Sequence, residues 1–229
     1  MTITKCIPNK SMISFKCIRQ AFTSLELFGK TIHPNALIEN AADNGIINSR
    51  FLFLVFTSSI ASTVGLLINS PAIIIGSMLI APLTTLGLVQ GFAIVTGDLT
   101  LWFDSLLALV ISTFLSFFVP YLLVKLLPED KTQSTLELSS RENYGGREVL
   151  VALAAGLVAG YGFLYEDTIA FAGSQIVLSL VPVTAATGFF LAKGNRKSAL
   201  NAFIYYLINI GAVILGVILV KLFADVIMS

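Results

Sequence analysis

Six apolar segments dominate this chain, and each is about as long as a helix that crosses a lipid bilayer. A helix needs about 20 apolar residues to cross the hydrocarbon core, because each residue adds about 1.5 Å along the axis. Only helices and closed barrels satisfy every backbone hydrogen bond in lipid. We therefore predict an all-α integral membrane protein with six transmembrane helices, at about residues 51–68, 72–95, 101–127, 149–165, 168–192 and 199–223.

The composition agrees with a membrane protein and argues against other classes. Hydrophobic residues make up 56% of the 229 positions and charged residues 12%, too few to cover the surface of a globular protein of this size. The net charge of +1 and the absence of basic runs give no sign of nucleic-acid binding. The first 20 residues contain four basic residues and no continuous apolar stretch, so no signal peptide is expected. Membrane lipid is thus the expected partner, and nucleic acid is not.

The six segments form two trios with the same order of landmarks. The middle segment of each trio contains a proline near its centre, Pro82 in the first and Pro182 in the second. Gly97-Asp98 follows the first middle segment, as Gly194-Asn195 follows the second. A trio has an odd number of crossings, so a second copy would lie upside down relative to the first. We therefore predict a 3+3 inverted repeat with proline-broken second and fifth helices, a pattern that recurs among secondary transporters.

This repeat divides the chain into four parts. Residues 1–50 form an N-terminal interfacial segment and 51–127 the first three-helix repeat, whereas 128–147 form a polar loop and 148–224 the second repeat. In the first part, apolar residues from Phe15 to Phe28 recur every three or four positions, which predicts an amphipathic helix that ends at Gly29. A second short helix is expected from Asn35 to Asp43. The amphipathic helix would lie on the membrane or on a partner subunit.

The distribution of Lys and Arg leaves the number of crossings open. With six crossings and the N-terminus inside, seven basic residues lie on each side. When only residues within about 20 positions of a membrane end are counted, the basic loops favour an N-terminus outside. A five-crossing alternative makes residues 71–95 re-entrant and leaves only Lys221 opposite the other basic residues. The repeat favours six crossings.

The polar residues inside the apolar segments are hydroxyls and amides, and no charged residue lies in the middle of a segment. Proton-coupled transporters usually need an intramembrane Asp, Glu or His. Each central proline lacks an N–H and leaves a carbonyl without its helical partner, near Met78 for Pro82 and at Leu178 for Pro182. Such carbonyls and hydroxyls suit a monovalent cation such as Na⁺, whereas the helix N-termini after the breaks suit an anion. A neutral polar site near the midplane is therefore predicted.

The predicted ligand or ion path combines the two proline regions with polar residues near them. It comprises Asn69, Ser70, Gly76, Ser77, Pro82, Thr84, Thr85, Ser174, Ser179, Pro182, Thr184 and Asn209. Each residue also has a structural interpretation, because Ser and Thr link transmembrane helices and glycine permits close packing. Asn69-Ser70-Pro71 equally suits a tight turn that starts the second helix.

Several stretches together form a recognisable pattern: residues 58–61, 65–72, 75–83, which include Ile80-Ala81-Pro82-Leu83, and 96–98, with Leu180-Val181-Pro182 and Leu207-Ile208-Asn209 in the second half. This pattern resembles the bacterial and archaeal domain-of-unknown-function 389 (DUF389) family of hydrophobic membrane proteins. The chain departs from the family pattern at Pro182-Val183, where a double proline is usual, and at residues 142–147. The resemblance implies a multi-pass protein of a prokaryotic cytoplasmic (inner) membrane, and it implies no activity.

These features favour a transporter or channel for a small solute or monovalent ion over a non-transporting lipid-binding or assembly component. We do not expect an enzyme, since His33 is the single histidine and no nucleophile–base pair, metal-ligand spacing or phosphate-binding loop is present. No cofactor or metal is expected, and Cys6 and Cys17 are interpreted as reduced thiols. Small residues at four-residue spacing should allow close helix crossings; they are Ala152, Gly156, Gly160, Ala212 and Gly216. A homo-oligomer is also expected.

Overall fold

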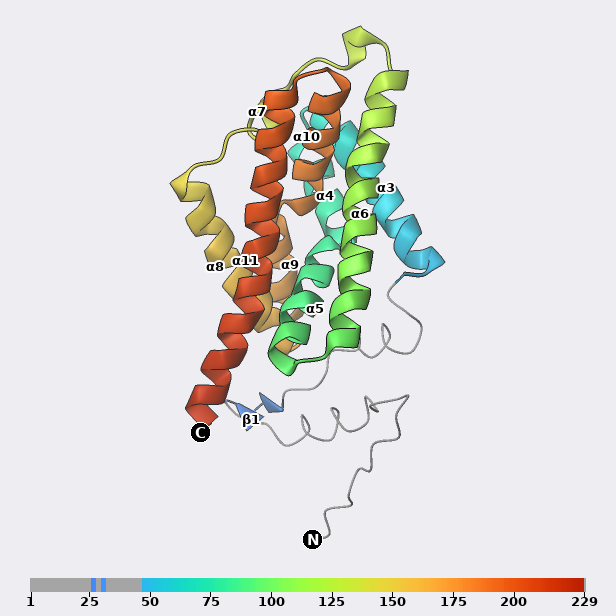
Figure 1. Cartoon of the computed structure of the whole chain (residues 1–229). Coiled ribbons are helices and arrows are strands. Elements are labelled where there is room, and N and C mark those ends of the chain that lie inside the picture. Colours follow the sequence, from blue (N-terminus) through green and yellow to red (C-terminus); the bar gives the residue numbers. More distant parts are fainter. Residues whose placement is uncertain (1–25, 28–29, 32–46, 229) are drawn as a thin grey trace.

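The computed structural model describes residues 26–27, 30–31 and 47–228, and over that part the protein is a bundle of long helices (Figure 1). The two strands are β1 (Glu26–Leu27) and β2 (Lys30–Thr31), which pair antiparallel. The helices are α3 (Ser49–Leu67), α4 (Pro71–Ile80), α5 (Leu83–Thr96), α6 (Leu99–Leu126), the 3₁₀ helix η1 (Glu129–Lys131), α7 (Leu136–Ser139), α8 (Gly146–Leu164), α9 (Thr168–Leu178), α10 (Leu180–Ala192) and α11 (Arg196–Met228).

The N-terminal amphipathic helix was predicted to run through Leu27, and the structure contradicts its last turn. Glu26 and Leu27 lie in strand β1, paired with Thr31 and Lys30. Gly29, at which the helix was predicted to end, lies outside the described residues. The rest of that predicted helix, the helix at 35–43 and both cysteines lie outside the described residues.

All six predicted apolar segments are helical, and the second and fifth are broken. Within the part of the chain that the structure describes, five helical spans are long and apolar enough to cross a membrane, and α4 with α5 makes a sixth if the bent pair counts as one span. The bend between α4 and α5 is 42°. Both halves therefore continue in the same general direction, from one end of the bundle to the other (Figure 1). This geometry differs from a re-entrant loop, which would return to the end where it began.

The first break lies at the predicted proline. Helix α4 ends at Ile80, Ala81 is extended with a ψ of 134°, and Pro82 is the N-cap of α5. Proline has no N–H to donate to the preceding turn, so it cannot continue α4, but it is well tolerated at a helix start. The local chemistry of Pro82 thus accounts for this break.

The second break lies at Ser179, directly after Leu178, whose carbonyl was predicted to lose its helical partner. Ser179 adopts a left-handed conformation with a φ of 51° and stands between α9 and α10. Pro182 is the third residue of α10, where the first N–H groups of a helix have no partner within it. Its missing N–H therefore costs α10 no hydrogen bond, and α9 ends at Leu178, four residues before the proline.

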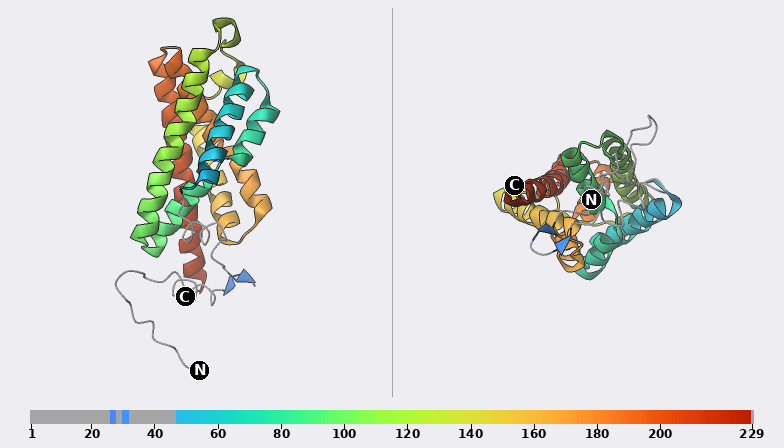
Figure 2. Two further views of the ribbon diagram at one scale, coloured as in Figure 1. Left: turned by 90° about the vertical axis from the view of Figure 1, so that its right-hand side faces the viewer. Right: turned by 90° about the horizontal axis from the view of Figure 1, so that it is seen from below.

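Helices α5 and α10 form the centre of the bundle. Nearly every residue of α10 is buried, as are most residues of α5. Helix α10 packs against α3, α6 and α11, and α5 packs against α6 and α11. The end-on view shows α3, α6, α8 and α11 toward the outside (Figure 2). The two central helices are therefore the C-terminal halves of the two broken spans.

The small-residue pattern produces the closest helix contact, between α8 and α11. A Cβ atom added at Gly156 would collide with the carbonyl oxygen of Ala212, and one added at Gly216 would collide with the carbonyl oxygen of Gly156. One added at Gly160 would lie 2.7 Å from the carbonyl carbon of Gly216. The prediction of a close crossing between these segments is confirmed.

Candidate functional site

The two helix breaks meet inside the bundle. The Ser179 hydroxyl lies 3.8 Å from the sulfur of Met78, which belongs to the last turn of α4. Ser179 follows 11 residues of α9, or about 16 Å of helix rise, and 13 residues of α10 follow it. The contact is therefore near the middle of its span. Through Met78 and Ser179 the structure brings together the regions of Pro82 and Pro182.

Most predicted hydroxyls around the breaks bond to their own helix. Ser77 donates to the Ile74 carbonyl at 2.7 Å, and Ser174 and Thr184 make equivalent bonds within α9 and α10. These bonds use the hydroxyl proton and leave the oxygen lone pairs available as acceptors. Thr84 is buried and Thr85 half-buried in the first turn of α5. The hydroxyls at the breaks are thus held in place by local bonds.

Three other predicted residues have different surroundings. Asn69 and Ser70 form the tight turn between α3 and α4, where Asn69 has a φ of 56° and Ser70 is the N-cap of α4. The ten residues of α4 separate this turn from the break, so the turn lies at an end of the bundle. Gly76 is half-buried, and open space surrounds the position of an added Cβ. These positions are not part of the meeting point of the breaks.

An arginine from the polar loop reaches this meeting point, and the sequence analysis missed it. One terminal nitrogen of Arg141 donates to the Ser179 hydroxyl at 2.8 Å, and the other lies 3.1 Å from a carboxylate oxygen of Glu137. The third donor, Nε, is buried and has no hydrogen-bond partner. The site is therefore not purely neutral. Arg141 is 38 positions from Ser179, and no periodicity in the sequence connects them.

Helix α11 contributes the opposite side of this polar cluster. Tyr205 and Asn209 lie one turn apart on α11. The Tyr205 ring stacks on Tyr144 of the loop with centroids 6.1 Å apart. The predicted residue Asn209 is only 2% exposed, and its amide nitrogen has no hydrogen-bond partner. We use the term Arg141 cluster for Arg141, Tyr144, Ser179, Tyr205 and Asn209.

The loop at 128–147 is bonded to several helices at the same end of the bundle. The Thr135 hydroxyl donates to the Leu66 carbonyl at 2.7 Å, and the Glu137 N–H donates to Asn69 Oδ1 at 3.0 Å. Lys193 Nζ donates to the Thr132 hydroxyl at 2.6 Å. These contacts reach both halves of the bundle and fix the segment that carries Arg141. The loop is therefore part of the candidate site.

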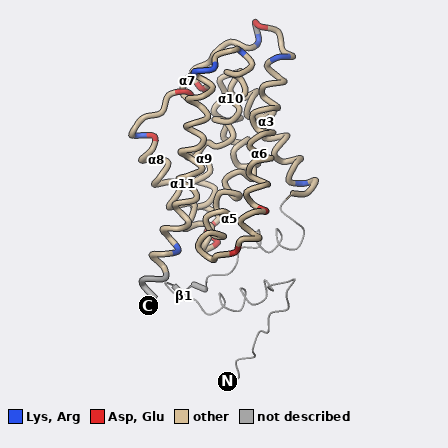
Figure 3. Tube along the Cα trace, in the orientation of Figure 1, with Lys and Arg blue, Asp and Glu red and all other residues tan. Residues whose placement is uncertain are grey.

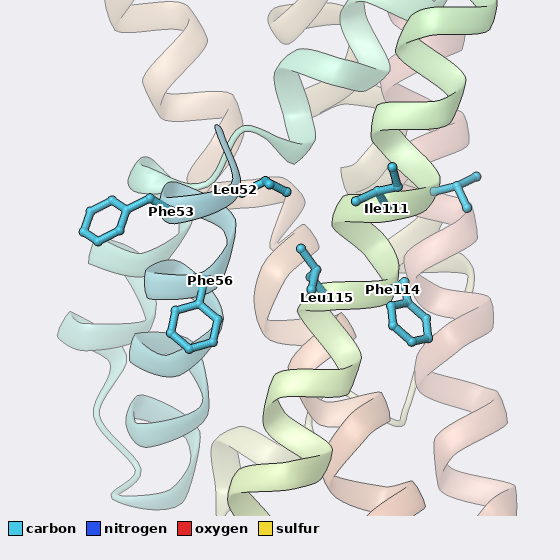
Figure 4. Close-up of a pocket in the computed structure, with 7 residues that line it drawn as sticks. Leu52, Phe53, Phe56, Ile111, Phe114 and Leu115 are labelled. Atoms are coloured by element: carbon cyan, nitrogen blue, oxygen red, sulfur yellow. The ribbon is translucent and has the colours of Figure 1, made fainter. Parts of the chain in front are cut away.

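An apolar groove of about 720 Å³ lies between α3 and α6 (Figure 4). All of its lining side chains are hydrocarbon, so it offers no side-chain hydrogen bond to a polar solute. The groove is separate from the Arg141 cluster, and its apolar lining suits acyl chains. The lining residues are Leu52, Phe53, Phe56, Val110, Ile111, Phe114 and Leu115. Among the described residues, no group of three His, Cys, Asp or Glu side chains is placed to hold a metal ion.

The apolar helices and the polar contacts between broken spans define a multi-pass membrane protein. The family model "Domain of unknown function (DUF389)" matches residues 78–215, more than half of the chain, and the protein belongs to this family. The predicted family is thus confirmed. The chain is also similar to an uncharacterised protein of Methanocaldococcus jannaschii, with 23% identity over 180 residues that cover 79% of this chain and 56% of that protein. The chain therefore spans about half of that relative's length. No solved structure matches the chain.

Proposed function

We propose that this protein is a transporter or channel that carries a small solute or ion along a polar route where the two helix breaks meet. The observation that supports this most is the Arg141 cluster at the break of α9 and α10. A charged group and unpaired amides are expensive to bury in a membrane protein, and they generally mark a substrate or ion pathway. A non-transporting component would need only packing contacts at this place.

An inverted 3+3 repeat is part of this proposal, and the turns of the two trios support it. Corresponding features lie 97 positions apart along the chain: left-handed Asn69 and Glu166, left-handed Gly97 and Gly194, and N–H bonds from Ser70 to Gly65 and from Asp167 to Gly162. With this spacing Ser179 corresponds to Pro82, and Pro182 does not. We therefore align the two breaks on Pro82 and Ser179.

The helix contacts support the same repeat. If α3 to α6 correspond to α8 to α11, with the η1 and α7 loop between them, each main contact has a counterpart in the other trio. The contact of α3 with α6 matches that of α8 with α11, and the contact of α6 with α10 matches that of α11 with α5. In secondary transporters with inverted repeats, substrate sites lie near the midplane where discontinuous helices meet.

A thiol-labelling experiment tests whether water reaches the breaks. In a variant with Cys6 and Cys17 replaced by serine, we expect cysteines placed at Thr84 or Ser179 to react with a charged, membrane-impermeant methanethiosulfonate reagent. Buried positions in a dry seam would not react, because the charged reagent does not enter hydrocarbon. The measurement is the labelled fraction in proteoliposomes, determined by intact-protein mass spectrometry.

Two control positions make the labelling result interpretable. Val110 is 58% exposed near the middle of α6, facing outward, and a cysteine there should remain unlabelled in a bilayer. Ser134, exposed in the loop, should be labelled when the reagent is on its side. Absence of labelling at both Thr84 and Ser179, with Ser134 reactive, would contradict a hydrated route and favour a non-transporting component.

The charge distribution also predicts the orientation. Lys and Arg of the 128–147 loop and of the α10–α11 turn lie at one end of the bundle, whereas the turns at the other end carry Asp98, Glu166 and Asp167 (Figure 3). The positive-inside rule places the basic end in the cytoplasm. Helix α11 runs from the basic end to the C-terminus, so this orientation places the C-terminus outside the cytoplasm. Alkaline phosphatase fused after Ser229 should therefore be active, and green fluorescent protein at the same place should be dark. The reverse pattern would overturn this orientation.

We further propose that membrane lipid covers the apolar groove between α3 and α6, and that the protein assembles as a homo-oligomer. The groove is lined by hydrocarbon side chains, which match acyl chains in polarity. Many outward side chains of α6 and α11 are large and apolar, as expected for surfaces that face lipid or another subunit. Neither partner contributes to the Arg141 cluster in this proposal.

A further inference from the structure

We propose that Arg141 and Asn209 bind the carboxylate group of the solute, so that the substrate is a small organic monoanion. This inference deepens the proposed function and depends on it. It names the substrate class, which the helix breaks alone do not indicate. Some hydrogen-bond donors of the Arg141 cluster have an acceptor within the protein, and others have none.

Two buried donors of the cluster have no acceptor. Arg141 uses its two terminal nitrogens for Ser179 and Glu137, and Nε is left without a partner. Asn209, 2% exposed, has an amide nitrogen that is also without a partner. Tyr205 connects the two donors, because it precedes Asn209 by one turn of α11 and its ring stacks on Tyr144, three residues after Arg141. Buried donors are nearly always paired, and a bound acceptor would complete both of them.

The charge of the cluster selects a monoanion. Arg141 provides one positive charge, of which Glu137 offsets a part at 3.1 Å, and Glu148 also acts on Tyr205. A dianionic phosphate would meet too little positive charge, whereas a carboxylate brings one charge and two acceptor oxygens. A planar guanidinium is well suited to a carboxylate, because its fixed N–H groups match the geometry of the two oxygens.

The loop limits how the carboxylate can arrive. Tyr144 stacks on Tyr205 from the loop side, and the bond of Glu137 to Asn69 fixes the helix that precedes Arg141. Arg141 itself is only 17% exposed in its side chain. A soluble carboxylate would therefore enter as the loop moves, whereas a fatty acid would enter from the bilayer. Both sources share the carboxylate, and the experiment separates them.

The test is the thermal unfolding of the full-length protein in detergent with a series of salts at equal ionic strength. The soluble probes are acetate, lactate, glutamate and benzoate, the fatty-acid probe is octanoate, and chloride and phosphate are the comparison anions. At about 100 times its Kd, a bound carboxylate should raise the Tm by about 5–10 °C. A saturable rise with octanoate alone would identify the lipid source.

Variants separate specific binding from general salt effects, which also stabilise proteins. Arg141→Gln and Asn209→Leu should each abolish the carboxylate-dependent rise in Tm. The matched control is Arg147, exposed in the first turn of α8, and Arg147→Gln should keep the rise. Arg141→Lys retains the charge and should raise the apparent Kd for the carboxylate at least tenfold. It replaces the glutamine variant as the test if that variant does not fold.

The outcomes are distinct from those of the thiol-labelling experiment. The proposal is overturned if no carboxylate raises the Tm above chloride, if phosphate gives the larger specific rise, or if the rise persists in both Arg141→Gln and Asn209→Leu. Labelling of Thr84 and Ser179 without carboxylate binding would leave the transport proposal standing and remove only the substrate class.

Discussion

Replacing Gly156 with alanine should strongly destabilise the protein. The added Cβ would collide with the backbone carbonyl of Ala212 on α11, and backbone atoms cannot move aside as a flexible side chain can. Relief requires α8 and α11 to separate, which breaks the closest helix contact of the bundle. Overpacking typically costs about 1–3 kcal/mol, and a clash with backbone belongs at or above the upper end.

The matched control for this prediction is Gly211→Ala on α11. Nothing lies within 4 Å of a Cβ added at Gly211, and this residue is half-buried in the same helix pair. Since alanine favours a helix over glycine by about 1 kcal/mol, this variant should be as stable as the natural chain or slightly more stable. The measurement is the Tm by fluorescence-detected size-exclusion chromatography. Equal Tm values for the two variants would show that the α8–α11 contact does not limit stability.

Replacing Ser179 with valine should give the second large effect. Ser179 has a φ of 51°, a region that costs ordinary L-residues about 1–2 kcal/mol and is worst for β-branched side chains. Valine also removes the oxygen that accepts the bond from Arg141, and an unpaired buried donor costs about 1–3 kcal/mol. Serine already carries the ordinary cost of this conformation, so the lost bond accounts for about 1–3 kcal/mol and only the excess strain of the β-branched side chain adds to it. We therefore expect a loss of at least about 1–3 kcal/mol in the free energy of unfolding.

Ser179→Gly separates the two contributions. Glycine adopts a positive φ without strain, so this variant loses the bond to Arg141 but is relieved of the conformational cost that serine carries. Because these two effects oppose each other, the Tm of Ser179→Gly should lie close to that of the natural chain and above that of Ser179→Val. If the glycine variant were the least stable, the conformational argument would be wrong, and the hydroxyl bond would be the main contribution of Ser179. Unfolding in detergent at a fixed detergent-to-protein ratio is the appropriate readout.

The helices and their bounds could be predicted from the sequence, because the signal is local. A run of apolar residues long enough to cross a bilayer has to be helical in lipid, and the bounds agree with the structure to within a few residues, apart from the longer end of α11. The break at Pro82 was predicted because the missing N–H acts on its own turn. The small-residue contact of Gly156 was predicted from spacing. Each of these depends on neighbours along the chain.

The conformation at the second break could not be read from the sequence. Pro182 predicts an interruption at the Leu178 carbonyl, four residues earlier, and α9 ends at Leu178, but the left-handed conformation of Ser179 was not predicted. A serine in a left-handed conformation has no distinctive sequence pattern. It is held there by surrounding structure, including the hydrogen bond from Arg141 and the contact with Met78.

The sequence by itself determined a membrane-embedded helical bundle with two interrupted spans, and it identified the family. The tertiary structure alone decided that the polar loop reaches the second break through Arg141 and packs on α11 through Tyr144 and Tyr205. The physical reason is the range of the interactions. Apolar length and proline act within one segment, whereas the Arg141 cluster joins a loop, a helix break and α11, which approach one another only when the whole bundle packs.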